Sequence, residues 1–238
     1  MSERVLITGG ASGIGLGLAK RFAARGDRVA ICDADGAAVA RVRAEHPAFI
    51  AAQADVTDET QMEAFFADVE QAWGGVDVVC ANAGTGGPAG RIEDLEYDAW
   101  RACLDVNLSG TFLTCRWAAR VMRAQGAGLI VITTSTAGLF GYPLRAPYAA
   151  AKWGLVGLTK TLAMELGPVG VRVNALAPGA VEGDRMDRVV AMEAAAGGKT
   201  QDEVRAQYVK GVSLRSWVNV DDLADMALFL ASPAASKI

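Results

Sequence analysis

The stretch Val5-Leu6-Ile7-Thr8-Gly9-Gly10-Ala11-Ser12-Gly13-Ile14-Gly15 joins a short apolar run to a glycine-rich turn, and a helical pattern follows it. Glycine lets a backbone approach a ligand closely, and the first turn of a helix offers unpaired N–H groups at the positive end of its dipole. This arrangement predicts a pyrophosphate-binding turn, although a merely tight turn would have the same composition. No Gly-Lys-Ser/Thr follows, so a Walker P-loop is excluded. The candidate contacts are Gly9, Ser12, Gly13, Ile14 and Gly15.

Short β-branched runs alternate with longer amphipathic stretches along the chain. Strands are predicted at Arg4–Thr8, Arg28–Cys32, Phe49–Ala54, Val76–Ala81, Leu129–Thr134 and Val171–Leu176. Helices are predicted at 13–25, 35–45, 58–72, 97–124, 147–166 and 221–231. This alternation is typical of an α/β fold, a doubly wound parallel sheet with helices on both faces. Ligands of such sheets bind at the carboxyl ends of the strands, so residues that follow a strand are the functional candidates.

The composition narrows the classes of partner. Among 238 residues, 23 Lys and Arg stand against 27 Asp and Glu, a net charge of −4. Nucleic acid binding needs a basic surface and is therefore not expected. No stretch approaches the roughly 18 apolar residues of a membrane span, and the first apolar run is too short for a signal peptide. We expect a single cytoplasmic domain over residues 1–238, with no membrane partner.

Metal binding has little support in the sequence. The four cysteines lie far apart without a CxxC spacing, and His46 is the single histidine. No metal site is therefore expected. His46 precedes Pro47 in a polar connection and is predicted to be a surface residue.

Asp33 ends the second predicted strand, where dinucleotide-binding folds place an acid against the adenosine ribose. A carboxylate there accepts hydrogen bonds from the ribose hydroxyls and repels a 2′-phosphate. Ala11, Ser12 and Ala34 offer no positive charge to hold such a phosphate. The sequence favours NAD over NADP, the alternative being that Asp33 is a solvated turn residue.

Tyr148 and Lys152 lie four positions apart in a predicted helix and share one face, which Ser135 can meet from the end of a strand. A free tyrosine, with a pKa near 10, is too weak an acid to serve as a base at neutral pH, but a nearby ammonium stabilises its phenolate. Tyr148 is therefore a candidate general base. A buried tyrosine beside a lysine that extends to solvent would show the same spacing.

Together these motifs resemble the short-chain dehydrogenase/reductase family from Val5 to about Pro233. The markers occur in the family's order: the TGxxxGIG turn at 8–15, Asp55-Val56, Asn82-Ala83-Gly84, Asn107, Ser135, Tyr148-x-x-x-Lys152 and Pro178-Gly179. The resemblance implies a Rossmann-type NAD(P) oxidoreductase that acts on a small alcohol or carbonyl substrate, and Asp33 favours NAD as its cofactor. It also implies a homotetramer or homodimer.

The resemblance further implies a role for each matching residue. Lys152 also binds the nicotinamide ribose, Ser135 hydrogen-bonds the substrate oxygen, and Asn107 orders a water that relays the proton from Lys152 to solvent. The other cofactor contacts that it implies are Asp55 and Val56 at the adenine, Asn82, Ala83 and Gly84 under the cofactor, and Pro178, Gly179 and Val181.

Two features depart from the family. A threonine common five positions after the proline of Pro178-Gly179 is replaced by Gly183, so that hydroxyl contact is absent. The chain ends at Ser236-Lys237-Ile238, where the family usually continues into a further strand, so a C-terminal strand is expected to be missing.

The segment 183–212 is polar, rich in charge, and contains Gly197-Gly198. It is interpreted either as a mobile lid over the substrate or as an ordinary surface loop containing a helix. Arg145 and Arg185 could hold an anionic group of the substrate, but each taken alone is more readily explained as a solvated surface arginine.

Two other functions share the fold. An NADPH-dependent 3-oxoacyl-carrier reductase would have the same tetrad, and Asp33 argues against it. A non-catalytic dinucleotide sensor would not need the set of Asn107, Ser135, Tyr148 and Lys152.

Overall fold

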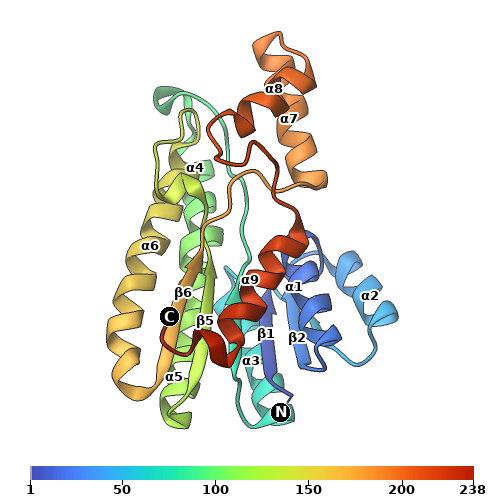
Figure 1. The fold of residues 1–238 in the computed structure, drawn as a ribbon, viewed down its shortest axis with the longest axis vertical. Helices are drawn as coiled ribbons and strands as arrows, with labels where there is room; N and C mark the ends of the chain where they lie inside the picture. The colour runs from blue at the N-terminus through green and yellow to red at the C-terminus, as the bar shows by residue number, and fades with distance from the viewer. Residues whose placement is uncertain (1) are drawn as a thin grey trace.

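Six parallel strands form one sheet at the centre of the molecule (Figure 1), described by a computed structural model. The description covers residues 2–238, without the side chains at positions 184, 185, 196 and 197. The strands are β1 (Arg4–Thr8), β2 (Arg28–Asp33), β3 (Ile50–Gln53), β4 (Val78–Ala81), β5 (Gly128–Thr133) and β6 (Val171–Leu176). Their order is β3-β2-β1-β4-β5-β6. The order reverses between β1 and β4, where sheets of this kind bind their ligands.

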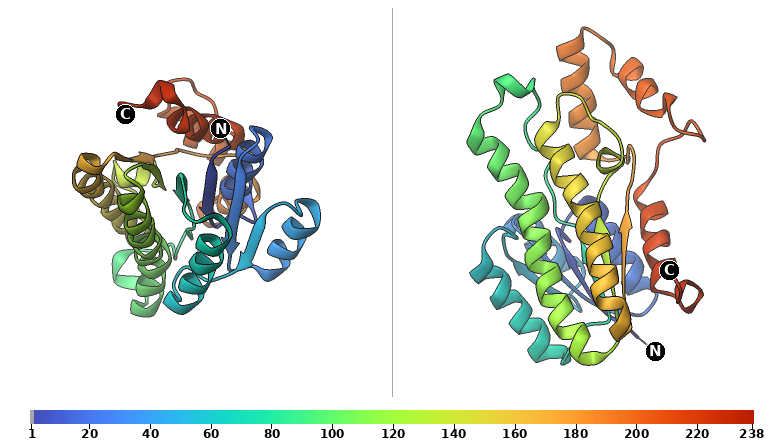
Figure 2. Two further views of the ribbon diagram at one scale, coloured as in Figure 1. Left: turned by 90° about the horizontal axis from the view of Figure 1, so that it is seen from below. Right: turned by 90° about the vertical axis from the view of Figure 1, so that its left-hand side faces the viewer.

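Helices cover both faces of the sheet (Figure 2). On one face lie α1 (Gly13–Ala24), α2 (Gly36–Glu45) and α9 (Val220–Ala231), and on the other lie α3 (Glu59–Trp73), α5 (Gly110–Gln125) and α6 (Ala146–Leu166). Successive residues of β1 point to opposite faces, so Val5 and Ile7 pack in the first layer and Leu6 in the second. The doubly wound α/β prediction is confirmed.

Local chemistry sets several helix ends. The Asp35 side chain caps α2 by accepting from the N–H groups of Ala37 and Ala38, and Asp58 caps α3 through Gln61. Gly74 ends α3 in the left-handed conformation, with φ +68°. Short polar residues at these positions satisfy N–H groups that the helix leaves unpaired.

The long helix predicted over 97–124 is wrong in its middle. The structure has α4 (Tyr97–Leu104), a π-helical turn at Asp105–Ser109, and then α5. β3 and β4 are also shorter than predicted. Val76 does not join β4 because its N–H donates to the Gln125 side chain instead of a neighbouring strand.

His46 also differs from the prediction. It is partly buried, its ring stacks on Phe49 at a centroid distance of 4.8 Å, and its Nε2 has no hydrogen-bond partner. The connection after α2 therefore packs one face of the histidine ring against Phe49 and leaves the residue partly exposed.

The segment 183–212 forms two helices, α7 (Asp184–Gly197) and α8 (Gln201–Lys210), which stand beyond the carboxyl edge of the sheet (Figure 1). They share a small core of Val190, Ala194 and Val204, and Thr200 and Glu203 form a capping box that starts α8. Within the described residues, no helix has the length and apolar character needed to cross a bilayer.

Candidate active site

The glycine-rich turn after β1 is packed against protein on one side and open on the other. Gly9 has φ +62°, and a Cβ there would lie 2.8 Å from the Cα of Ala83. A Cβ on Gly15 would lie 2.0 Å from the carbonyl oxygen of Gly9. A Cβ on Gly13, with φ +49°, would meet nothing within 4 Å. The turn therefore leaves its backbone accessible to a ligand at Gly13.

Ser12 precedes α1 in an extended conformation, and its side chain makes no capping hydrogen bond. It is exposed, whereas Ile14 is partly buried against the core below α1. The first N–H groups of α1 are thus not capped by Ser12. Uncapped N–H groups at the positive end of a helix dipole are suited to an anion such as a pyrophosphate.

Asp33 lies at the end of β2 beside this turn. One carboxylate oxygen accepts from the backbone N–H of Ala11 at 3.1 Å, and the other accepts from that of Asp35 at 3.1 Å. These bonds fix the carboxylate at the carboxyl edge while leaving lone pairs for further donors. The glycine turn, the start of α1 and Asp33 thus fit a dinucleotide.

Asn82 joins the three central strands. Its Nδ2 donates to the carbonyls of Thr8 and Gly9 at 3.2 and 3.3 Å, and its Oδ1 accepts from the Thr133 hydroxyl at 3.2 Å. The N–H groups of Asn82 and Ala83 both donate to the Thr8 hydroxyl. The Asn82 side chain is therefore occupied in holding β1, β4 and β5 together, and a cofactor would meet the backbone here.

Asp55 and Val56 follow β3 on the far side of the site. The Asp55 carboxylate accepts from the N–H and hydroxyl of Thr57 at 2.9 and 2.8 Å. Val56 is buried, and a Cβ on Gly110 of α5 would lie 2.7 Å from its Cγ2. Both side chains thus stabilise the turn and its packing on α5.

Tyr148 and Lys152 point to the same side of α6. The Lys152 Nζ lies 5.6 Å from the centre of the Tyr148 ring and donates to the carbonyl of Thr133 at 2.9 Å. Lys152 is only 3% exposed, and Thr134 holds its turn of α6 by donating to the Lys152 carbonyl at 3.0 Å. The structure thus places a buried ammonium beside a phenol ring.

Ser135 follows β5 and begins the short turn Thr136–Gly138. Its hydroxyl accepts from the Ala137 N–H at 3.2 Å and is 3.5 Å from the carbonyl of Pro178, which also accepts from the Thr136 N–H at 2.9 Å. The segment after β6 is thereby fixed next to Ser135. The peptide groups on either side of Val181 hydrogen-bond to Val218. A Cβ on Gly179 would lie 3.9 Å from the Cγ2 of Thr136.

Asn107 lies in the π-helical turn and is fully buried. Its Nδ2 donates to the carbonyls of Thr85 and Cys103 at 3.0 and 2.9 Å, while its Oδ1 has no hydrogen-bond partner. A Cβ on Gly84 would lie 2.8 Å from this oxygen and 3.6 Å from the Lys152 Nζ. The two polar atoms therefore converge on Gly84, and the acceptor at Asn107 is suited to a water near Lys152.

A pocket of about 380 Å³ adjoins these residues at Gly84. Its lining is Gly84, Thr85, Gly86, Gly87, Arg145, Arg188, Val189 and Met192, and we call it the substrate pocket. Arg145 is only 8% exposed, so its interpretation as a solvated surface arginine is wrong. The rings of Tyr142 and Tyr148 and the carbonyl of Gly86 surround it instead. The Arg185 side chain lies outside the described residues.

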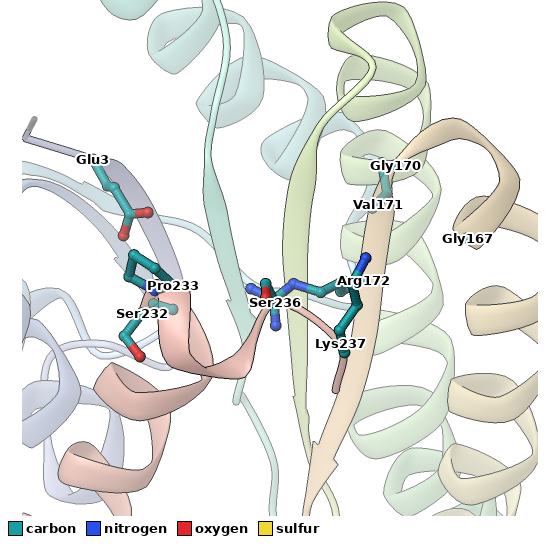
Figure 3. A pocket seen from close by; sticks show the side chains of 10 residues that line it. Glu3, Gly167, Gly170, Val171, Arg172, Ser232, Pro233, Ser236 and Lys237 are labelled. Atoms are coloured by element: carbon teal, nitrogen blue, oxygen red, sulfur yellow. The ribbon is translucent and has the colours of Figure 1, made fainter.

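A second pocket, of about 490 Å³, lies at the amino end of β6 (Figure 3). Glu3, Arg172 and Lys237 contribute its charges, and it contains none of the predicted site residues. Arg172 is held there by the carbonyls of Leu230 and Ala235. The larger pocket is therefore the one without predicted site residues, and the smaller pocket is the one that contains Gly84 at the carboxyl edge of the sheet.

Several groups at the site could not be predicted from the sequence. The carbonyls of Thr133 and Thr85 accept from Lys152 and Asn107, and a carbonyl is present at every residue, so it carries no signal. The link from Tyr142 through Tyr208 to Glu193 is equally invisible in the sequence, since it joins three segments. Among the described residues, no group of three His, Cys, Asp or Glu could hold a metal ion.

Comparison with known proteins identifies the family to which this chain belongs. The family described as short chain dehydrogenase matches residues 3–194. D-beta-hydroxybutyrate dehydrogenase of Rhizobium meliloti is 32% identical over 100% of this chain and 95% of that protein. Galactitol 2-dehydrogenase of Agrobacterium fabrum is 37% identical over 98% of this chain and 91% of that protein.

Solved structures agree closely in fold. NAD+-bound xylitol dehydrogenase superposes with a TM-score of 0.93 at 28% identity, covering 99% of this chain and 94% of that one. An actinorhodin polyketide ketoreductase variant with NADPH gives a TM-score of 0.93 at 32% identity, covering 100% and 93%. The chain therefore belongs to the short-chain dehydrogenase/reductase family and is an oxidoreductase that uses a nicotinamide dinucleotide on alcohol or carbonyl substrates.

Proposed function

We propose that this enzyme is an NAD-dependent dehydrogenase that interconverts a secondary alcohol and its ketone, with Tyr148 as the general acid and base. The observation that carries the proposal is the Lys152 Nζ, buried and 5.6 Å from the centre of the Tyr148 ring. When bound, the dinucleotide supplies the hydride acceptor or donor.

The chain's own residues handle the proton. In oxidation, the Tyr148 oxygen takes the proton of the substrate hydroxyl while Lys152 stabilises the phenolate. Ser135 donates to the substrate oxygen from the neighbouring strand end. The unpartnered Oδ1 of Asn107 holds a water that passes the proton from Lys152 to solvent.

The proposed preference for NAD rests on Asp33. Its carboxylate is fixed by Ala11 and Asp35 at the edge of the glycine turn, and a 2′-phosphate beside it would be repelled. The proposed cofactor contacts remain the backbone of Gly9, Gly13 and Gly15 together with Asp33. Asp55 and Val56 are proposed to contact the adenine, and the other residues named for the cofactor in the sequence analysis are proposed to contact the rest of it.

The main alternative is an NADPH-dependent 3-oxoacyl-carrier reductase, since one similar structure is a polyketide ketoreductase with NADPH. The relatives named above act on a hydroxy acid and on a polyol, so we favour a small substrate. A non-catalytic dinucleotide sensor is disfavoured because it would have no use for a buried ammonium beside a phenol.

The remaining proposals concern assembly and location. We propose that α7 and α8 act as a lid over the substrate pocket. Exposed Phe112, Trp153 and Met164 on α5 and α6 support a homodimer or homotetramer. Four free, buried thiols support a reducing, cytoplasmic location.

Turnover of secondary alcohols, polyols and hydroxy acids with NAD and with NADP tests the function. Tyr148→Phe should lower kcat by about 10⁴-fold, the upper end of the range for a general base, with cofactor affinity nearly unchanged. A rate above about a tenth of the wild-type value would refute the role of Tyr148.

The same assay tests the cofactor. We expect kcat/KM with NAD to exceed that with NADP by at least about tenfold, which corresponds to 1.4 kcal/mol. Asp33→Ala combined with Ala34→Arg should reverse the preference. Equal use of NADP by the wild type would overturn the role of Asp33 and favour the carrier-reductase alternative.

A further inference from the structure

The substrate pocket contains a buried cation without an anionic partner. Arg145 is 8% exposed, and its Nη2 donates to the carbonyl of Gly86 at 2.8 Å. Its Nε is buried and has no hydrogen-bond partner. No carboxylate among the described side chains forms an ion pair with it. A buried charge of this kind is unfavourable unless an opposite charge compensates it.

The local structure holds Arg145 in this position. Leu144 adopts φ +64°, a left-handed conformation that is strained for a branched side chain, and its carbonyl accepts from the Gly90 N–H at 2.9 Å. The guanidinium carbon lies 5.8 Å from the ring centres of both Tyr142 and Tyr148. These rings offset part of the desolvation of the cation but provide no counter-charge.

A second arginine lines the same pocket. Arg188 of α7 is exposed and, like Arg145, forms no ion pair among the described side chains. Two carboxylates of α7 are engaged elsewhere, since Asp187 pairs with Arg205 and Glu193 accepts from Tyr208, and the side chain of Asp184 lies outside the described residues. The charge of the pocket lining is therefore positive, and Val189 and Met192 supply an apolar wall beside it.

We propose that Arg145, together with Arg188, binds a carboxylate or sulfonate group of the substrate, so that the enzyme acts on small hydroxy acids. This inference rests on the proposed function, because it places the anion next to the proposed catalytic Tyr148. A guanidinium binds such an anion through charge-assisted hydrogen bonds, and Arg145 is a lining residue of the pocket. The pocket volume of about 380 Å³ fits a small molecule whose apolar part lies against Met192.

A binding experiment tests the inference without requiring turnover. Cyclohexanecarboxylate and cyclohexanecarboxamide have the same shape and differ in charge, and their dissociation constants are measured by NMR titration into the enzyme saturated with NADH. We expect the carboxylate to bind at least about 30-fold more tightly, as charge-assisted bonds in a desolvated site allow. Equal affinities in the wild type would overturn the inference and leave the proposed function standing.

Variants assign the effect to the arginines. Arg145→Met should remove the preference for the carboxylate while the amide still binds, Arg145→Lys should retain part of it, and Arg188→Met should reduce it by a smaller factor. Arg41→Met, which removes an exposed arginine of α2 outside the pocket, is the control and should change nothing. Equal loss of both ligands in Arg145→Met and Arg145→Lys would show a purely structural role and overturn the assignment.

Turnover separates the two proposals. With 3-hydroxybutyrate and its methyl ester as substrates, Arg145→Met should raise KM for the acid by a much larger factor than KM for the ester. Oxidation of uncharged alcohols in preference to hydroxy acids would refute the anion site alone. Failure to oxidise any alcohol, with the carboxylate preference in binding intact, would refute the proposed function alone.

Discussion

We propose that the carboxyl edge of the sheet has two halves. The proposed cofactor half lies at the ends of β1, β2 and β4, and the proposed substrate half lies around Arg145, α7 and α8. The cofactor half is built from backbone, with Gly9 and Gly15 in contacts too close for a side chain. The substrate half is built from side chains of distant segments, such as Arg145 on Gly86 and Tyr208 on Tyr142. Substitutions in the first half should therefore lower both stability and cofactor affinity. Substitutions in the second half should change substrate binding with little effect on the stability of the domain.

The strongest test of this contrast is Gly15→Ala in the cofactor half. The added methyl would lie 2.0 Å from the Gly9 carbonyl oxygen, so the turn must shift. We expect unfolding to become easier by about 1–3 kcal/mol and the NADH dissociation constant to rise by about 10–100-fold, measured by denaturation and by fluorescence titration.

The matched control is Gly157→Ala on the exposed side of α6, where a Cβ meets nothing within 4 Å. Gly157 shares a face of α6 with Trp153, which lies in the proposed subunit interface, so only cofactor binding is compared, and the NADH dissociation constant should stay unchanged. Wild-type affinity in Gly15→Ala would show that the turn does not approach the cofactor.

Asn107 lies at the junction of the two halves and gives the next largest effect. Removing its amide in Asn107→Ala should lower kcat by about 10²-fold, the lower end of the range for proton-transfer groups. It should also shift the pH dependence of kcat, because the unpartnered Oδ1 next to Lys152 is the proposed water site.

Thr111→Val is the control for the shape of the π-helical turn, since the Thr111 hydroxyl donates to the Asn107 carbonyl at 2.9 Å. If Thr111→Val lowered kcat and shifted its pH profile as much as Asn107→Ala does, the turn and not the amide would be responsible.

The two halves also differ in what the sequence could predict. β1 and β6 have the predicted bounds, because a short run with β-branched residues that ends shortly before a glycine or a proline marks a strand locally. The sharing of one helix face by Tyr148 and Lys152 follows from helical periodicity alone and is confirmed. The sequence therefore predicts the features that local residue spacing determines.

The sequence does not predict the features that depend on packing between distant segments. The π-helical turn at Asn107 adds one residue to a helical turn, and nothing in the apolar period marks it. The burial of Arg145 depends on a carbonyl 59 residues away in the sequence and on two tyrosine rings. A polar segment such as 183–212 gives no periodic signal strong enough to show that it folds into α7 and α8.

Tyr208→Phe probes the substrate half with a smaller expected effect. The Tyr208 hydroxyl lies 3.2 Å from that of Tyr142 and donates to Glu193 at 2.7 Å, so it links α7 and α8 to the loop before α6. Losing these bonds should raise the substrate KM by about three- to tenfold. Amide exchange in α7 and α8 should become faster, while KM for NAD stays constant.

The control is Tyr97→Phe, because Tyr97 is exposed and its ring contacts only Arg101 among the aromatic and cation pairs described. Unchanged exchange in Tyr208→Phe, with or without NAD and a substrate analogue, would mean that the hydroxyl does not hold the two helices in place.

The link also has a pH dependence. Burial, followed by the hydrogen bonds with Tyr142 and Glu193, raises the pKa of Tyr208 above its usual value. Its contribution to stability is thus fully present below the unfolded pKa of about 10 and is lost as the pH rises through the folded value. The protection of the α8 amides, measured relative to their intrinsic exchange rates, should therefore stay constant from pH 6 to about pH 9.

The smallest effect is expected at the opposite end of the sheet, where Asp77 binds Arg4 far from both halves. Its carboxylate accepts from the Arg4 N–H at 2.8 Å and from the guanidinium at 2.6 and 2.9 Å. Burial opposes ionisation, but the bonds with Arg4 outweigh it and hold the pKa of Asp77 below its usual value.

The stabilisation by Asp77 is therefore present above the unfolded pKa of about 3.9 and is lost as the pH falls through the lower folded value. Because both side chains are partly exposed, Asp77→Asn should cost only about 1 kcal/mol at pH 7, or roughly 2–4 °C in Tm. The difference in Tm should shrink towards pH 2, with kcat and KM unchanged at pH 7, whereas an equal difference at both pH values would show that packing and not the ionised carboxylate joins β1 to β4.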